Sequence, residues 1–103
     1  MMQIVTADNG NDDTISIRAG ESLDLSACDV VTDVCNLAKQ PHIRFLVIDL
    51  ENTKHIRDSG LAILILLRQR ARKLVRQITI VNCRSEVRSR IFASSLTTAF
   101  RFA

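Results

Sequence analysis

The 103-residue sequence has no tryptophan and no tyrosine, and four phenylalanines are its only large aromatic side chains. A formal charge of +3 and a pI near 9.1 would suit a nucleic-acid partner. Proteins that bind single strands stack bases on exposed aromatic rings, however, and this sequence has few to offer. Acidic residues crowd the first third and basic residues crowd positions 68–76. Because cations near the end of a helix stabilise its dipole, we interpret the basic stretch as a solvated helix end and expect no nucleic-acid partner.

The sequence also lacks a cysteine framework and a long apolar run. Its three cysteines, Cys28, Cys35 and Cys83, form neither an even set nor a C-x-x-C pair, so we expect reduced core thiols rather than disulfides or a zinc site. The longest apolar run, 61–67, is far shorter than the roughly 20 residues of a membrane-spanning helix. No signal or transit peptide is visible at the start. We therefore expect a cytoplasmic protein without membrane insertion and without a cofactor.

The order of the predicted elements indicates an α/β fold. Alternating apolar and polar residues predict a hairpin of two strands, and apolar residues at spacings of three and four predict helices. The expected elements are strands over 2–6 and 14–19, a helix over 26–39, a strand over 43–50 covered on both faces, a helix from Ser59 to about Val75, a strand over 77–81, a helix from 84 to about 95, and an edge strand in the tail 96–103. Strand, helix and strand in succession imply a parallel pair with a right-handed crossover. We expect one domain over 1–103 with a mixed, mostly parallel sheet packed by about three to four helices.

The loop ENTKHIRDSG joins the most apolar strand to the central helix and ends at Ser59. In open α/β sheets, sites form at the carboxyl ends of the strands. Capping chemistry predicts that Ser59 is the N-cap of the helix. A phosphoryl group on Ser59 would add a charge of about −1.5 to −2 beside the positive end of the helix dipole, which the fold would tolerate and a docked partner would not. The residues alone leave cap and switch as alternatives.

Residues 43–67, IRFLVIDLENTKHIRDSGLAILILL, resemble the core motif of STAS domains, the family of anti-sigma factor antagonists. In that motif an apolar strand ends in Asp-Leu, a loop follows, and Ser-Gly-Leu opens an apolar helix. Residues 78–91, ITIVNCRSEVRSRI, resemble the next strand, loop and helix, and residues 20–24 are similar to the segment before the first helix. The resemblance covers almost the whole chain and implies a STAS-like fold.

The resemblance implies that Ser59 is the phosphorylation site of a partner switch. The unphosphorylated form would bind an anti-sigma factor or switch serine kinase, and a PP2C-type metal-dependent phosphatase would restore it, controlling transcription, biofilm formation or related signalling. Partner contacts are expected at Asp24, Arg57, Asp58, Ser59, Gly60 and Leu61. Arg57 and Asp58 depart from the commonest Asp-Ser-Ser-Gly pattern, since Arg57 could pair with a phosphate and Asp58 would repel it.

Two other function classes remain to be weighed. The chain could be a non-catalytic accessory subunit of a transport or lipid-trafficking complex, in which Ser59 is only a cap. An enzyme has no support in the sequence, because there is no Gly-rich phosphate loop, and His42 and His55 stand in predicted loops without a ligand at metal spacing. Asp49, at a strand end, fits a turn residue better than a contact residue.

Overall fold

The computed structural model describes residues 2–6, 13–94 and 100–103 and, of residues 5 and 6, the backbone alone. The elements in chain order are β1 (Gln3–Thr6), β2 (Thr14–Arg18), β3 (Ser22–Leu23), the 3-10 helix η1 (Leu25–Ala27), α1 (Cys28–Ala38), β4 (Phe45–Asp49), β5 (His55–Ile56), α2 (Asp58–Ala71), β6 (Gln77–Val81), α3 (Ser85–Ala93) and β7 (Arg101–Phe102). Three α-helices and a mostly parallel mixed sheet confirm the predicted α/β class.

The main sheet has five strands in the order β1-β2-β4-β6-β7. The first pair is antiparallel, which confirms the predicted hairpin, and the other pairs are parallel. In the register, Ile48 of β4 lies between Ile17 of β2 and Ile80 of β6. The predicted edge strand in the tail is confirmed at Arg101–Phe102. Positions 95–99, which include the predicted end of the last helix, lie outside the described residues.

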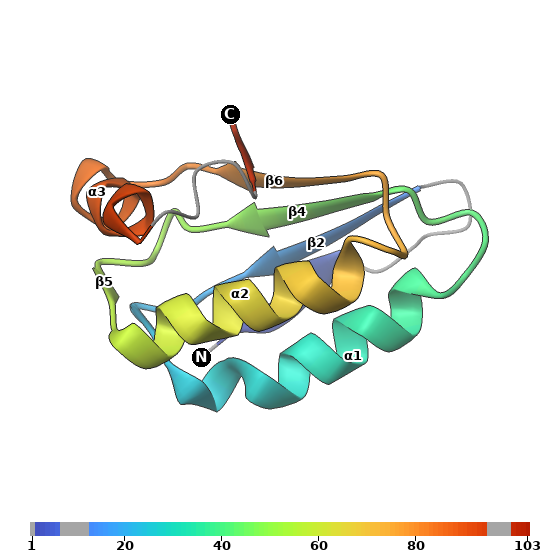
Figure 1. Ribbon diagram of the computed structural model, residues 1–103, viewed down its shortest axis with the longest axis horizontal. Helices are drawn as coiled ribbons and strands as arrows, with labels where there is room; N and C mark the ends of the chain where they lie inside the picture. The colour runs from blue at the N-terminus through green and yellow to red at the C-terminus, as the bar shows by residue number, and fades with distance from the viewer. Residues whose placement is uncertain (1, 7–12, 95–99) are drawn as a thin grey trace.

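Helices α1 and α2 lie side by side on one face of this sheet (Figure 1). The apolar residues of α2 that were predicted to enter the core do so, since Ile63, Leu64 and Leu67 are at most 2% exposed. No described helix has the length and apolar content needed to cross a membrane. The core therefore fills the space between one helical layer and one side of the sheet.

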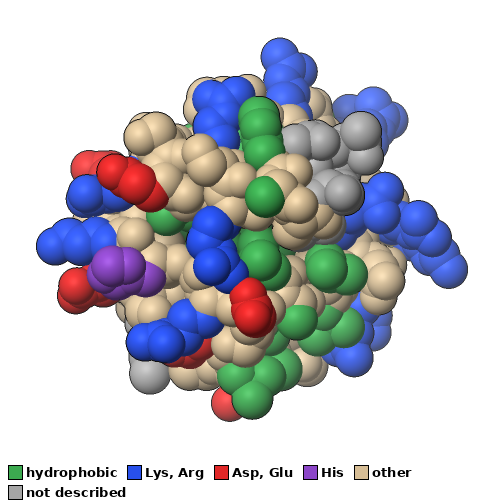
Figure 2. Space-filling model, turned by 60° about the vertical axis from the view of Figure 1, so that its left-hand side comes forward, with side chains coloured by type: hydrophobic (Ala, Val, Ile, Leu, Met, Phe, Trp, Pro, Cys, Tyr) green, Lys and Arg blue, Asp and Glu red, His purple; other side chains and the backbone are tan. Residues whose placement is uncertain are grey.

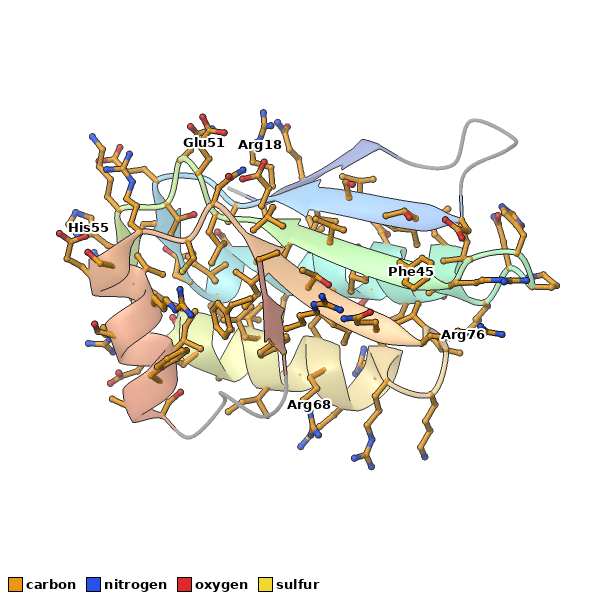
Figure 3. All side chains as sticks on the ribbon, turned by 90° about the horizontal axis from the view of Figure 1, so that it is seen from above. Arg18, Phe45, Glu51, His55, Arg68 and Arg76 are labelled. Atoms are coloured by element: carbon orange, nitrogen blue, oxygen red, sulfur yellow. The ribbon has the colours of Figure 1, made fainter. Side chains whose placement is uncertain are left out.

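The prediction that the 43–50 strand is covered on both faces is wrong. In β4, Leu46 and Ile48 are buried, whereas the alternate residues Phe45 and Val47 are only partly buried. Figure 3 looks onto the sheet from the side opposite the helices, and no described helix crosses that side. Apolar residues on both faces of the strand hid the alternation that a one-sided strand normally shows.

The predicted core position of the cysteines holds for one of the three. Cys35 is buried in α1 and Cys83 is partly buried after β6, but Cys28 is exposed. The helix predicted over 26–39 begins at Cys28, because the 3-10 helix η1 precedes it, and this start turns Cys28 outward. Burial raises the pKa of both the Cys35 and the Cys83 thiols, so these two stay protonated at neutral pH.

The loop between β4 and α2 is pinned to residues 20–23. The hydroxyl of Thr53, which is fully buried, donates to the carbonyl of Gly20 at 2.8 Å. The backbone N–H groups of Lys54 and His55 both donate to the carbonyl of Glu21. Two-residue strands β3 and β5 then pair in parallel as a second sheet. These bonds fix the path of the chain into α2.

Candidate functional site

Ser59 lies in the first turn of α2 but does not cap the helix. The N-cap is Arg57, whose extended backbone places its carbonyl to accept the N–H of Leu61 at 3.0 Å. The helix therefore begins at Asp58, one residue earlier than predicted. It ends at Ala71 rather than near Val75, because the chain turns there and the N–H groups of Leu74 and Val75 both donate to the Ala71 carbonyl. Ser59 is the second helical residue and partly exposed, and its hydroxyl makes no hydrogen bond with the described part of the chain.

Gly60 allows the start of α2 to sit directly against β3. A Cβ atom at this position would lie 2.1 Å from the Leu23 carbonyl oxygen and 3.1 Å from a side-chain carbon of Ile56. The same Leu23 carbonyl accepts the N–H of Arg57 at 3.1 Å. Because both the glycine contact and the hydrogen bond use one backbone atom, Gly60 sets how deeply the first turn of the helix is seated.

Asp24 follows β3 and lies close to this helix start. Its carboxylate accepts the Ser26 hydroxyl at 2.7 Å and the Ser26 N–H at 3.0 Å, capping η1. These two bonds hold the pKa of Asp24 below its ordinary value, and the charge of Arg57 acts in the same direction. Leu25, the next residue, is 65% exposed. The structure thus gathers Asp24 with Arg57, Asp58, Ser59, Gly60 and Leu61, the expected contact residues, at one end of the molecule.

Helix α3 adds a residue that the sequence did not indicate. Arg90 lies on α3, and one of its guanidinium nitrogens donates to the Asp58 carboxylate at 2.6 Å. A hollow of about 450 Å³ opens beside this pair and is lined by His55, Ile56, Arg57, Asp58 and Arg90. No pattern in the sequence links positions 58 and 90. The only available signal was that the helix after the next parallel strand returns toward the same end of the sheet.

Asp49 is the last residue of β4, and its carboxylate accepts hydrogen bonds from groups within the fold. Burial acts to raise the pKa of Asp49, but hydrogen bonds from the Glu51 N–H, the Asn82 amide and the Arg18 guanidinium outweigh it and leave the pKa lowered. Figure 3 shows Arg18 and Glu51 together at this end of the strands. The interpretation of Asp49 as a turn residue is confirmed, since its oxygens are occupied within the fold.

The surface around Ser59 combines charge with exposed apolar area. The side chains of Leu25 and Ile65 are 65% and 38% exposed. Leu61, one turn before Ile65 in α2, is partly exposed. Figure 2, which looks toward this end, shows hydrophobic side chains gathered beside acidic, basic and histidine side chains. Among the described residues, no group of three or more His, Cys, Asp or Glu side chains could hold a metal ion. The arrangement fits a docking surface around an accessible hydroxyl.

Comparison with known proteins gives matches of fold. The anti-sigma factor antagonist SpoIIAA in its unphosphorylated form aligns with a TM-score of 0.74 and 17% identity, over 100% of this chain and 86% of that one. A serine-to-glutamate variant of Moorella thermoacetica RsbS aligns with a TM-score of 0.75 and 18% identity, over 89% of this chain and 80% of that one.

A third solved structure, the murine anion transporter Slc26a9, aligns with a TM-score of 0.71 and 15% identity, over 87% of this chain but 16% of that one. The sequence matches none of the curated proteins with which it was compared. Residues 7–103 match the family model of the STAS domain, which covers most of the chain. Together with the strand order and the helix that begins beside Asp58-Ser59-Gly60, this match shows that the chain belongs to the STAS domain family.

Proposed function

We propose that this chain is a phosphorylation-controlled partner-switching regulator in which Ser59 accepts the phosphoryl group. The observation that carries the proposal is the state of the Ser59 hydroxyl, which is partly exposed and bonded to no described group. Because Arg57 is the N-cap, the fold does not need this hydroxyl for capping. A side chain that the fold does not use is free to enter the active site of another protein.

Phosphorylation would change the surface more than the fold. The added charge of about −1.5 to −2 would meet the free N–H groups of the first turn of α2 and would be tolerated there. A partner seated over Leu25, Leu61 and Ile65 would instead have to bury that charge, which is costly without a matching cation. The unphosphorylated form therefore binds and the phosphorylated form is released.

The partners in this proposal are an anti-sigma factor or switch serine kinase and a PP2C-type phosphatase, acting in the cytoplasm. Two solved structures of similar fold support the choice, since one is an anti-sigma factor antagonist and the other is RsbS with serine replaced by glutamate. The domain itself would do no catalysis, and its output would be transcription, biofilm formation or related signalling. Asp24, Arg57, Asp58, Gly60 and Leu61 would contribute the contacts around Ser59.

The test is a pull-down from the native cell with Ser59→Ala as bait, followed by affinity measurements on the retained protein. Ser59→Ala should bind as tightly as the unphosphorylated chain, and Ser59→Asp should bind about tenfold or more weakly, because an unpaired charge buried in an interface costs on the order of 2 kcal/mol or more. Ser85 is a matched control, since it is an exposed serine in the first turn of α3. Equal affinity for both Ser59 variants, or an equal loss in Ser85→Asp, would contradict the proposal.

A second candidate function is a non-catalytic accessory domain of a transport assembly. It is favoured by one observation, the similarity of this fold to a small part of the anion transporter Slc26a9. In that case Ser59 would carry no phosphate. Intact-mass measurement of the protein recovered from its native cell separates the two, because a population one phosphate heavier that maps to Ser59 supports the switch and its absence under all growth conditions supports the accessory domain.

A further inference from the structure

A second hollow lies at the end of α2 remote from Ser59. Its volume is about 350 Å³. Four arginines line it: Arg68 from α2, Arg72 and Arg76 from the turn between α2 and β6, and Arg101 from β7. The rest of the lining is Val75, Gln77, Ile78 and Phe100. We call these residues the arginine pocket. Figure 3 shows Arg68 on α2 and Arg76 on the turn into β6.

The arginines of this pocket have no carboxylate partner in the described chain. No acidic residue lines the pocket, and none of the four arginines forms an ion pair with a described residue. Arginine stays protonated at any physiological pH. Four arginine side chains and no acidic one thus line a single hollow, and a concentration of one sign of charge in a hollow favours an anion within it.

The helix dipole accounts for only part of this clustering. Arg68 lies in the last turn of α2 and Arg72 is its C-cap, so both are stabilised by the negative end of the helix. Arg76 precedes β6, and Arg101 belongs to β7 and comes from the far end of the sequence. The dipole effect falls off within the last turn and gives no reason for these two to converge on the same hollow.

The walls and size of the pocket indicate what kind of anion it would hold. Val75, Ile78 and Phe100 are each 6% to 7% exposed and supply the apolar part of the lining. A volume of about 350 Å³ falls in the range of small-molecule sites, whereas single-stranded nucleic acid is bound along an extended track with aromatic rings on which bases stack. Planar guanidinium groups bind phosphate oxygens in pairs, and four of them match linked phosphates better than a single one.

We propose that the arginine pocket binds a small molecule that carries two or more linked phosphate groups. The site is separate from Ser59 and does not depend on the proposed partner switch. Arg70 and Lys73 provide a matched control, because they belong to the same end of α2 but line a different hollow next to α1. Removing them subtracts the same charge from the same region and leaves the arginine pocket intact.

The experiment is isothermal titration calorimetry of the full chain with inorganic tripolyphosphate at constant ionic strength. We expect one molecule bound per chain, and the double replacement Arg72→Gln with Arg101→Gln should weaken binding by about tenfold or more, because each charge-assisted hydrogen bond makes a large contribution. Arg70→Gln with Lys73→Gln should change the affinity by less than about threefold. Arg72 and Arg101 are exposed, so the double variant should fold, and its circular dichroism spectrum checks this. Arg76→Gln is an independent replacement in the same pocket.

Three results would overturn the proposal. An equal loss of affinity in the two double variants would show binding to a general basic surface. Several tripolyphosphate ions bound per chain would show the same. A hexa-aspartate peptide that binds as tightly as tripolyphosphate would show that the pocket receives an acidic protein segment instead.

Discussion

Replacing Gly60 by alanine tests how α2 is seated against β3. On an exposed helix, Gly→Ala stabilises by about 1 kcal/mol, because alanine is the better helix former. Here the new methyl carbon would lie 2.1 Å from the Leu23 carbonyl oxygen and 2.7 Å from its carbon, both of them backbone atoms. Backbone cannot swing aside as a flexible side chain can, so the helix or β3 must move. The structure therefore predicts a change of sign, from stabilising to destabilising.

The magnitude follows from three contributions. Overpacking typically costs about 1 to 3 kcal/mol. Displacement of Leu23 also weakens its hydrogen bond from the Arg57 N–H, which is worth about 1 kcal/mol. After the gain of about 1 kcal/mol in helix propensity, the net loss for Gly60→Ala is about 2 kcal/mol, or a fall in Tm of roughly 8 to 16 °C for a domain of this size.

Urea unfolding followed by circular dichroism measures this change directly. Ala62→Gly is the control, because Ala62 is exposed two residues later in the same helix and should lose only about 1 kcal/mol from propensity. If Gly60→Ala is as stable as the unmodified chain or more stable, the close approach of α2 to β3 does not exist and the proposed position of Ser59 has to be revised.

Three further predictions concern charge and thiols. Arg90→Gln should change the free energy of unfolding by less than about 1 kcal/mol, because its partner Asp58 is 97% exposed; a loss above about 2 kcal/mol in a urea titration would contradict this. The pKa of Asp49 is lower in the folded than in the unfolded chain, so its contribution to stability is complete above the unfolded pKa and is lost as the pH falls through the folded one. The stability difference between the unmodified chain and Asp49→Asn should therefore shrink as the pH falls below the ordinary aspartate pKa of 3.8, and a difference that stays constant on acidification would refute it. Iodoacetamide should label the exposed Cys28 well before Cys35, whose thiol is buried and has a raised pKa; mass spectrometry of the digested protein would show the order, and faster labelling of Cys35 would contradict its burial.

Periodicity predicted the parts of the fold in which one face is buried and the other is polar. The predicted strand over 77–81 coincides with β6, and the two strands of the hairpin, β1 and β2, were placed within one residue at each end. Periodicity failed to show that β4 is covered on one face alone, because Phe45 and Val47 on the open face are also apolar. It also missed β3 and β5, because two residues are too few to show any alternation.

The sequence predicted where the Ser59 site lies in the fold but not how its side chains are arranged. Ser59 was expected at the start of the central helix and is found in its first turn. The prediction that Ser59 caps the helix was wrong. It relied on capping preferences, which favour serine over arginine. In the structure, the hydrogen bond from the Arg57 N–H to the Leu23 carbonyl decides where the helix begins. The pairing of Asp58 with Arg90 depends on how α3 packs, which local sequence patterns do not record.

The shortness of β7 has a consequence for how this domain can change. Within the described residues, β7 pairs with β6 at Thr79 and Ile80, and the arginine pocket opens beside Gln77 and Ile78, the preceding residues of β6. Lengthening or recharging the C-terminal strand would reshape that hollow without altering the register of the four strands before it. A substitution in β7 can therefore alter the arginine pocket while the surface around Ser59, at the other end of α2, stays the same.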